Sequence, residues 1–166
     1  MTAVVLVGHG GVPRDFPRGE LQRLKALEGE RRARGAEPSD EERALERKIR
    51  TWPRTPVTDP YQAGLEAVAA TLRAKLGNAR VVVAYNEFCA PSLDDAVTEL
   101  VADGVGRITV VPSMLTPGGV HSEVEIPETL VALRSRFPGV ELRYAWPFDA
   151  DAVADLLALQ LRGRHE

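Results

Sequence analysis

Three side chains suited to metal or proton chemistry lie next to short apolar runs. His9 follows "AVVLVG", Glu87 follows "VVVAYN", and His121 follows "PSMLTPGGV" in a glycine-containing loop. Neutral imidazole is a common ligand for divalent transition metals, and a carboxylate adds negative charge or accepts a proton. If the three apolar runs end at one edge of a sheet, these residues form one site. The third histidine, His165, is the penultimate residue, and we expect it to be exposed and without a role.

Alternating strand and helix patterns predict how these residues are positioned. Each strand run is short and rich in β-branched residues, and each helix has a recognisable start or end. The predicted strands are 3–7, 80–85, 107–111 and 140–144; the helices begin at Asp59-Pro60, at the Ser92/Asp95 capping box, at Pro127 and at Asp149. This alternation predicts an α/β fold, with a doubly wound, mainly parallel four-stranded sheet flanked by helices. We expect a single domain spanning 1–166, given the length of the chain.

Doubly wound sheets bind ligands outside the carboxyl ends of their strands. In the predicted order, His9 follows the first strand, Glu87 follows the second and His121 lies past the third. The sequence therefore predicts that all three residues meet at one edge of the sheet.

Residues 14–58 do not fit a simple βα unit. Leucines spaced three apart from Leu21 to Leu27 form a narrow helical stripe, and Ser39 with Glu42 resembles a second capping box. The proline-rich "TWPRTPVTDP" then ends the helical pattern. We interpret the segment as a helical-hairpin insertion between the first strand and the first covering helix. Its charge favours a solvated arm, with a lid or a partner surface as the alternatives.

Composition excludes several classes of protein. The net charge of −3 argues against general nucleic-acid binding, because no basic excess is present. The apolar runs are too short to span a bilayer, and the N-terminus lacks the basic start of a signal peptide. Cys89 is the only cysteine, which fits a reducing compartment. We expect a cytoplasmic protein that binds neither nucleic acid nor membrane.

Other loop chemistries do not match the sequence. "GHGGVP" begins like a dinucleotide fingerprint, but Pro13 stands where the third glycine belongs. No phosphate-binding G-x-x-x-x-G-K-[ST] loop or G-x-S-x-G elbow is present, and Gly8 replaces the arginine of the histidine-phosphatase Arg-His-Gly motif. Cys89 is a conceivable nucleophile, but a small buried side chain is the simpler interpretation.

Three segments then resemble one family in sequence order. "VVLVGHGG", "AYNEFCAPSLDDAV" and "ITVVPSMLTPGGVHSEVEIPETL" are similar to sirohydrochlorin chelatases of the CbiX/SirB type, which are class II tetrapyrrole chelatases. The resemblance implies a chelatase-like fold and an ATP-independent enzyme that inserts cobalt, iron or nickel into sirohydrochlorin or a related tetrapyrrole. The divalent metal is then a substrate, and no permanent cofactor is expected.

The resemblance also implies roles for individual residues. His9 and His121 would bind or deliver the metal, and Glu87 would be an auxiliary ligand or proton acceptor. The flat substrate would contact Gly118, Gly119 and Met114, and Arg14 would bind its carboxylates. The first loop departs from the family pattern, because Gly11 replaces a serine and the next arginine is displaced to Arg14.

Both the oligomeric state and the class of function have alternatives. A chain of this length is half of the doubled architecture of larger relatives, so we expect either a homodimer or a monomer in which the insertion covers the cleft. A non-catalytic carrier or sensor of a metal or tetrapyrrole would use the same cleft. A metal- or cysteine-dependent hydrolase is a third interpretation.

Overall fold

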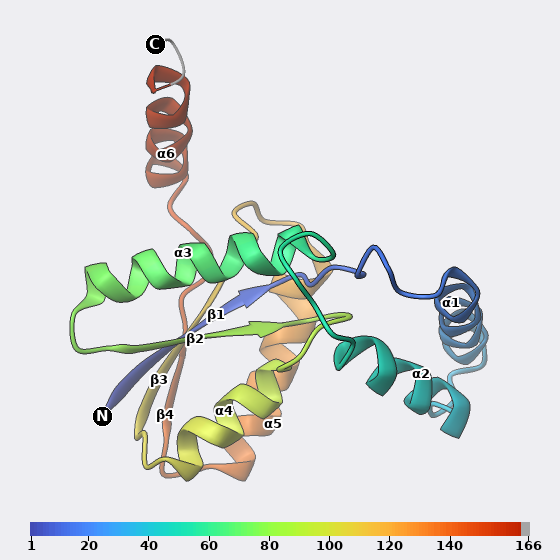
Figure 1. Cartoon of the computed structure of the whole chain (residues 1–166). Coiled ribbons are helices and arrows are strands. Elements are labelled where there is room, and N and C mark those ends of the chain that lie inside the picture. The colour runs from blue at the N-terminus through green and yellow to red at the C-terminus, as the bar shows by residue number, and fades with distance from the viewer. Residues whose placement is uncertain (164–166) are drawn as a thin grey trace.

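The computed structural model describes residues 1–163, so the expectation for His165 lies outside the described residues. Its centre is a four-stranded sheet in the order β2-β1-β3-β4 (Figure 1). The strands are β1 (Thr2–Gly8), β2 (Arg80–Tyr85), β3 (Arg107–Pro112) and β4 (Glu141–Tyr144). Every adjacent pair is parallel, which confirms the doubly wound α/β prediction.

Helices cover the two faces of the sheet unequally. On one face, α4 (Leu93–Ala102) and α5 (Ile126–Arg136) pack on all four strands and form the largest apolar core. On the other face, α3 (Pro60–Leu76) packs mainly on β1 and β2 through Leu65 and Ala69. Consequently β3 alternates between buried and half-buried residues after the exposed Arg107.

The insertion contains two helices that pack against each other, α1 (Arg18–Arg34) and α2 (Asp40–Arg50) (Figure 1). The predicted Ser39 cap is present, because its hydroxyl accepts a hydrogen bond from the Glu42 amide. Leu24 and Ile49 are buried between the helices together with Phe16, in a third apolar cluster that also contains Phe88. Since Phe88 belongs to the loop after β2, the insertion packs against the body of the domain near Glu87.

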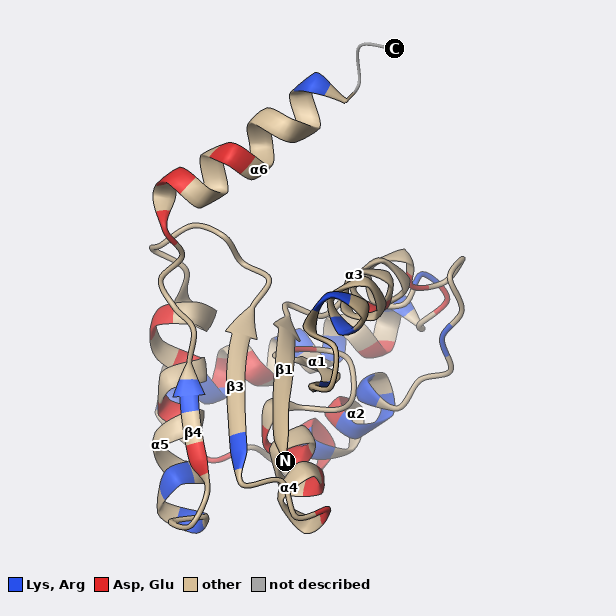
Figure 2. Ribbon diagram, turned by 90° about the vertical axis from the view of Figure 1, so that its left-hand side faces the viewer, with Lys and Arg blue, Asp and Glu red and all other residues tan. Residues whose placement is uncertain are grey.

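The C-terminal part differs from the expectation of a uniformly flanked sheet. Helix α6 (Ala150–Arg162) begins at the predicted Asp149 cap, but it projects away from the sheet and buries none of its residues (Figures 1 and 2). Within residues 1–163, no helix is long and apolar enough to cross a membrane.

Candidate metal site

Three loops at the carboxyl edge of the sheet bring His9, Glu87 and His121 together. His9 directly follows β1, Glu87 lies in the loop after β2, and His121 lies beyond β3. One potential ligand atom from each residue lies within 4.8 Å of the others. The structure therefore places these residues at a shared edge, as the sequence predicted.

The spacing of the three groups is close to that of a metal site. Nε2 of His9 lies 3.9 Å from a carboxylate oxygen of Glu87, and the His9 and His121 rings meet edge to face with centroids 4.6 Å apart. Two ligands that each lie about 2.1 Å from a metal are about 3.0–3.5 Å apart. A contraction of up to about 1–2 Å would therefore bring the three groups onto one cation.

Hydrogen bonding defines which nitrogen each histidine presents. Nδ1 of His9 lies 2.9 Å from the carbonyl oxygen of Gly10. A carbonyl only accepts, so neutral His9 carries its proton on Nδ1 and keeps the Nε2 lone pair free. The free lone pair faces Glu87, the orientation that metal coordination requires.

His121 is oriented by a carboxylate one helical turn away. Its Nδ1 lies 2.6 Å from an oxygen of Glu125, which accepts the Nδ1 proton and leaves Nε2 free. The side chain of His121 is 16% exposed, against 46% for His9 and 32% for Glu87. His121 is thus the most enclosed of the three potential ligands.

The backbone around His121 differs from the predicted loop. His121 begins a π-helical turn, η1 (His121–Glu125), in which the amide of Ile126 donates to the His121 carbonyl five residues back. The hydroxyl of Tyr144 donates to the carbonyl of buried Ser122 and fixes this turn against β4. Short π-helical turns occur frequently at functional sites. The predicted helix start at Pro127 lies one residue from the observed start of α5 at Ile126, but the π-helical turn from His121 precedes it and was not predicted.

The loops that carry His9 and Glu87 are in direct contact. The Glu87 amide donates to the His9 carbonyl at 2.8 Å. Gly10 has a φ of +97°, and a Cβ there would lie 1.8 Å from the Glu87 carbonyl oxygen, so only glycine fits. On the other side, the His9 amide donates to the Tyr61 hydroxyl at the start of α3. Backbone packing therefore fixes the distance between the two ligands.

Two arginines of the insertion hold the Glu87 loop. The Arg50 guanidinium donates to the carbonyls of Asn86 and Cys89. Arg54, whose side chain is 5% exposed, donates to the carbonyls of Gly11 and Phe88 and pairs with buried Asp59, the N-cap of α3. The end of the insertion thus connects the His9 loop, the Glu87 loop and α3. Sequence reasoning missed Arg50, Arg54, Tyr61 and Glu125.

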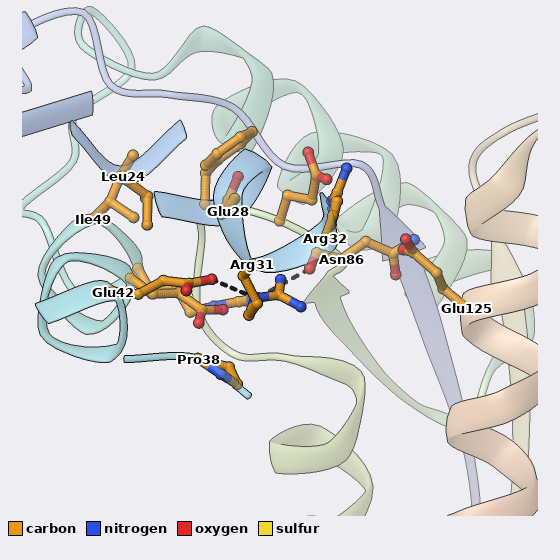
Figure 3. A pocket seen from close by; sticks show the side chains of 13 residues that line it. Leu24, Glu28, Arg31, Arg32, Pro38, Glu42, Ile49, Asn86 and Glu125 are labelled. Carbon is orange, nitrogen blue, oxygen red and sulfur yellow. Dashed lines mark hydrogen bonds and ion pairs between the residues drawn. The ribbon is translucent and has the colours of Figure 1, made fainter. Parts of the chain in front are cut away.

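A pocket of about 170 Å³ lies between the insertion and the body of the domain (Figure 3). Residues of α1 and α2 form one wall, while Glu87 and Glu125 form part of the other. Glu28 lines this pocket, and burial raises the pKa of its carboxyl, with Arg32 offsetting the effect and Glu87 adding to it. The insertion is therefore a wall beside the candidate metal site, rather than only a solvated arm.

The remaining predicted site residues lie in different surroundings. Met114 lines an open cleft of about 560 Å³ together with His9, Tyr61, Leu65, Val68 and Ser113. Gly118 and Gly119 are exposed, and the Gly118 amide donates to the Glu123 carboxylate. Neither Arg14 nor the two glycines belong to the described residues that line this cleft. The backbone amide of Arg14 instead donates a hydrogen bond to the Thr58 carbonyl. Their substrate contacts stay predictions.

Cys89 is a free thiol that is 1% exposed. Burial raises the pKa of this thiol, and Arg54 lowers it in part. A thiol held in its neutral form is a poor nucleophile. The interpretation of Cys89 as a small buried side chain is confirmed.

Comparisons with known proteins define first the fold class and then the family. The structure is similar to SirB from Bacillus subtilis with Fe3+, with a TM-score of 0.55 and 20% identity, covering 95% of this chain and 45% of that one. It is also similar to a putative cobalamin (vitamin B12) biosynthesis CbiX protein from Marinobacter aquaeolei VT8, with a TM-score of 0.56 and 19% identity, covering 100% of this chain and 99% of that one. These similarities show a chelatase-like fold.

The sequence comparisons identify the family. The CbiX family model matches residues 58–162, so the chain belongs to the CbiX family. A sirohydrochlorin ferrochelatase from Priestia megaterium is 30% identical over 76 residues, which are 45% of this chain and 28% of the relative. The chain therefore spans less than half the length of SirB, and its match to the ferrochelatase covers under a third of that protein.

Proposed function

We propose that this chain is a chelatase that inserts a divalent cation into sirohydrochlorin or a related tetrapyrrole without ATP. The observation that carries the proposal is the convergence of His9, Glu87 and His121, with both imidazoles presenting Nε2. Cobalt(II), iron(II) and nickel(II) all suit two imidazoles and a carboxylate, and the metal enters as a substrate.

The reaction exchanges one divalent cation for the two protons of the pyrrolic N–H groups. Neutral His9 and His121 hold the partly desolvated cation through Nε2, and Glu87 balances its charge. When the cation moves into the ring, the released protons are accepted by the vacated Nε2 atoms and by the Glu87 carboxylate. The site thereby serves both halves of the exchange.

The open cleft beside His9 supplies the place for the macrocycle. Its walls combine apolar side chains from α3 with Met114, which suits one face of a flat ring. Because His9 lines both this cleft and the metal site, a ring bound in the cleft lies next to the cation. Cytoplasmic location and a homodimer remain predictions that accompany this proposal.

An anaerobic metallation assay tests the proposal. The protein is mixed with sirohydrochlorin and, in separate reactions, with cobalt(II), iron(II) or nickel(II), and the absorption change is compared with that of an enzyme-free control. We expect many turnovers, lost in His9→Ala and in His121→Ala and retained in Glu128→Ala, an exposed residue of α5. Stoichiometric binding without turnover would instead identify a carrier or sensor. Full activity in both histidine variants would overturn the site assignment.

A further inference from the structure

The open cleft beside His9 contains hydroxyl groups but no lysine or arginine among the described residues that line it. Its walls are mainly apolar, and apart from His9 its polar side chains are Tyr61 and Ser113. A macrocycle that carries carboxylates therefore meets two hydroxyls in this cleft, whereas the sequence predicted an arginine. The two hydroxyls are the groups of the cleft that can bind such a carboxylate.

Tyr61 presents both an aromatic ring and an available proton to the cleft. The His9 amide donates to the Tyr61 hydroxyl oxygen at 2.8 Å, which uses one lone pair of that oxygen and leaves its proton to donate elsewhere. Among residues 1–163 this proton has no hydrogen-bond acceptor. Tyr61 is 39% exposed, so a ligand in the cleft can reach the ring and the hydroxyl.

The Tyr61 hydroxyl lies over the end of β1. A Cβ at Gly8 would lie 2.9 Å from the hydroxyl oxygen, closer than a side chain there could approach without displacing it. The glycine at this strand end therefore provides the space in which the phenol reaches the His9 amide.

Ser113 lies beside the same strand end. It follows Pro112, which pairs with Val7, and its amide donates to the Val7 carbonyl, so β3 runs alongside β1 up to this residue. Strand alternation places Ser113 on the same side of β3 as Val111, which packs with the cluster under α3. The Ser113 hydroxyl has only the Met114 sulfur as a partner, at 3.8 Å, and a thioether is a weak acceptor. Its proton is thus also available to a ligand.

We propose that Tyr61 and Ser113 form a carboxylate clamp: their two hydroxyls bind one carboxylate of the macrocycle and orient the ring beside His9. Neighbouring strands are about 4.8 Å apart, and a carboxylate bridges such a separation because each of its oxygens accepts an O–H bond of about 2.6 Å. Tyr61 also accepts from the His9 amide, so one side chain connects the bound carboxylate to a candidate metal ligand. The clamp rests on the tetrapyrrole substrate proposed above, and its two residues determine specificity for that substrate.

Binding of metal-free sirohydrochlorin, followed by the quenching of its fluorescence, tests the clamp without any metallation step. We expect Ser113→Ala and Tyr61→Phe each to lower the affinity for the ring by roughly tenfold, because each loses a hydrogen bond to a charged group. Tyr61→Leu should lower it further, since the aromatic face is removed as well. Thr109→Val is the matched control: Thr109 shares the side of β3 with Ser113 but lies outside the cleft, and its loss should leave the affinity unchanged.

Cobalt(II) binding in the absence of the ring separates recognition of the substrate from support of His9. Ser113→Ala leaves the contact between Tyr61 and His9 in place, so the affinity for cobalt(II) should not change. Tyr61→Phe removes the acceptor of the His9 amide and should lower the affinity for cobalt(II) as well. A purely structural role of Ser113 would instead change both affinities together.

Salt dependence distinguishes the clamp from binding by an arginine. The two hydroxyls are neutral, so the affinity of the natural chain for the ring should vary little with added salt, whereas ion pairs at an exposed site weaken steeply. Strong salt dependence, or an unchanged affinity for the ring in either Ser113→Ala or Tyr61→Phe, would overturn the clamp and leave the chelatase proposal standing. A natural chain that binds no metal-free ring would overturn the chelatase proposal and the clamp with it.

Discussion

Glu125 accepts the Nδ1 proton of His121 at 2.6 Å, four residues along the π-helical turn. The contact selects the tautomer in which Nε2 of His121 is free to bind a metal. In the proposed metal site Glu125 is therefore a positioning residue, because it would act on the metal through His121. A substitution of Glu125 should therefore change the affinity for the metal and the ring nitrogen of His121 that carries the proton.

Removal of this carboxylate should weaken metal binding. We expect Glu125→Ala to lower the affinity for cobalt(II) by about 10–100-fold, the usual effect of losing a residue that orients a histidine ligand. Glu125→Gln keeps an oxygen acceptor and should lose less. Competition with a chromophoric chelator measures the affinity, and nitrogen NMR of the histidines reports the tautomer. An unchanged tautomer in Glu125→Ala would contradict the assigned role, and Glu128→Ala serves as the control.

Gly10 should not tolerate a side chain. Gly10→Ala places a methyl group against the Glu87 carbonyl at a positive φ, which should cost about 1–3 kcal/mol of unfolding free energy and separate His9 from Glu87. Urea unfolding and cobalt(II) titration measure the two effects. Gly29→Ala, in α1 with open space around it, should instead be neutral or stabilising. Equal behaviour of the two variants would show that the two loops do not need this contact.

Arg54 should be important for stability although it lies in an insertion. Arg54→Met leaves the buried Asp59 carboxylate without its partner, and breaking a buried pair in this way costs about 3–5 kcal/mol. Urea denaturation gives the change in unfolding free energy. Arg43→Met, which removes an exposed pair with Asp40, should change it little. A similarly small change in Arg54→Met would mean that the insertion does not stabilise the domain.

Cys89 should be inert in the folded protein. Because burial raises its thiol pKa above the ordinary value, the neutral form persists at pH values where an exposed thiol already ionises. A chromogenic thiol reagent at mildly alkaline pH should therefore react slowly with the native chain and quickly after denaturation. Cys89→Ser should keep metallation activity. Its loss without loss of fold would revive a cysteine-dependent mechanism.

Sequence patterns correctly predicted the features that depend on residues close together in the chain, such as strand ends and helix caps. His9 and Glu87 were identified because each follows an apolar run that becomes a buried parallel strand. The helix caps at Asp59, Ser92 and Asp149 were also correct, since a cap depends on residues only a few positions apart.

Contacts between segments far apart in the chain could not be predicted from local sequence patterns. Arg54 lies in a proline-rich stretch without periodicity, and its partners come from three other parts of the chain. Glu125 was overlooked because Pro127 resembles a helix start, which placed His121 in a loop. For α6, the pattern predicted a helix, but apolar periodicity does not specify which surface the helix covers.

The wide spacing of His9, Glu87 and His121 has a kinetic consequence. Ligand atoms up to 4.8 Å apart do not enclose an ion at the ideal distance from all three groups at once. A cation held by these three residues would keep water in its remaining coordination positions, and a site that does not close around its ion favours rapid release. Fast dissociation is undesirable in a storage protein, but it suits a protein that must release the ion to a macrocycle.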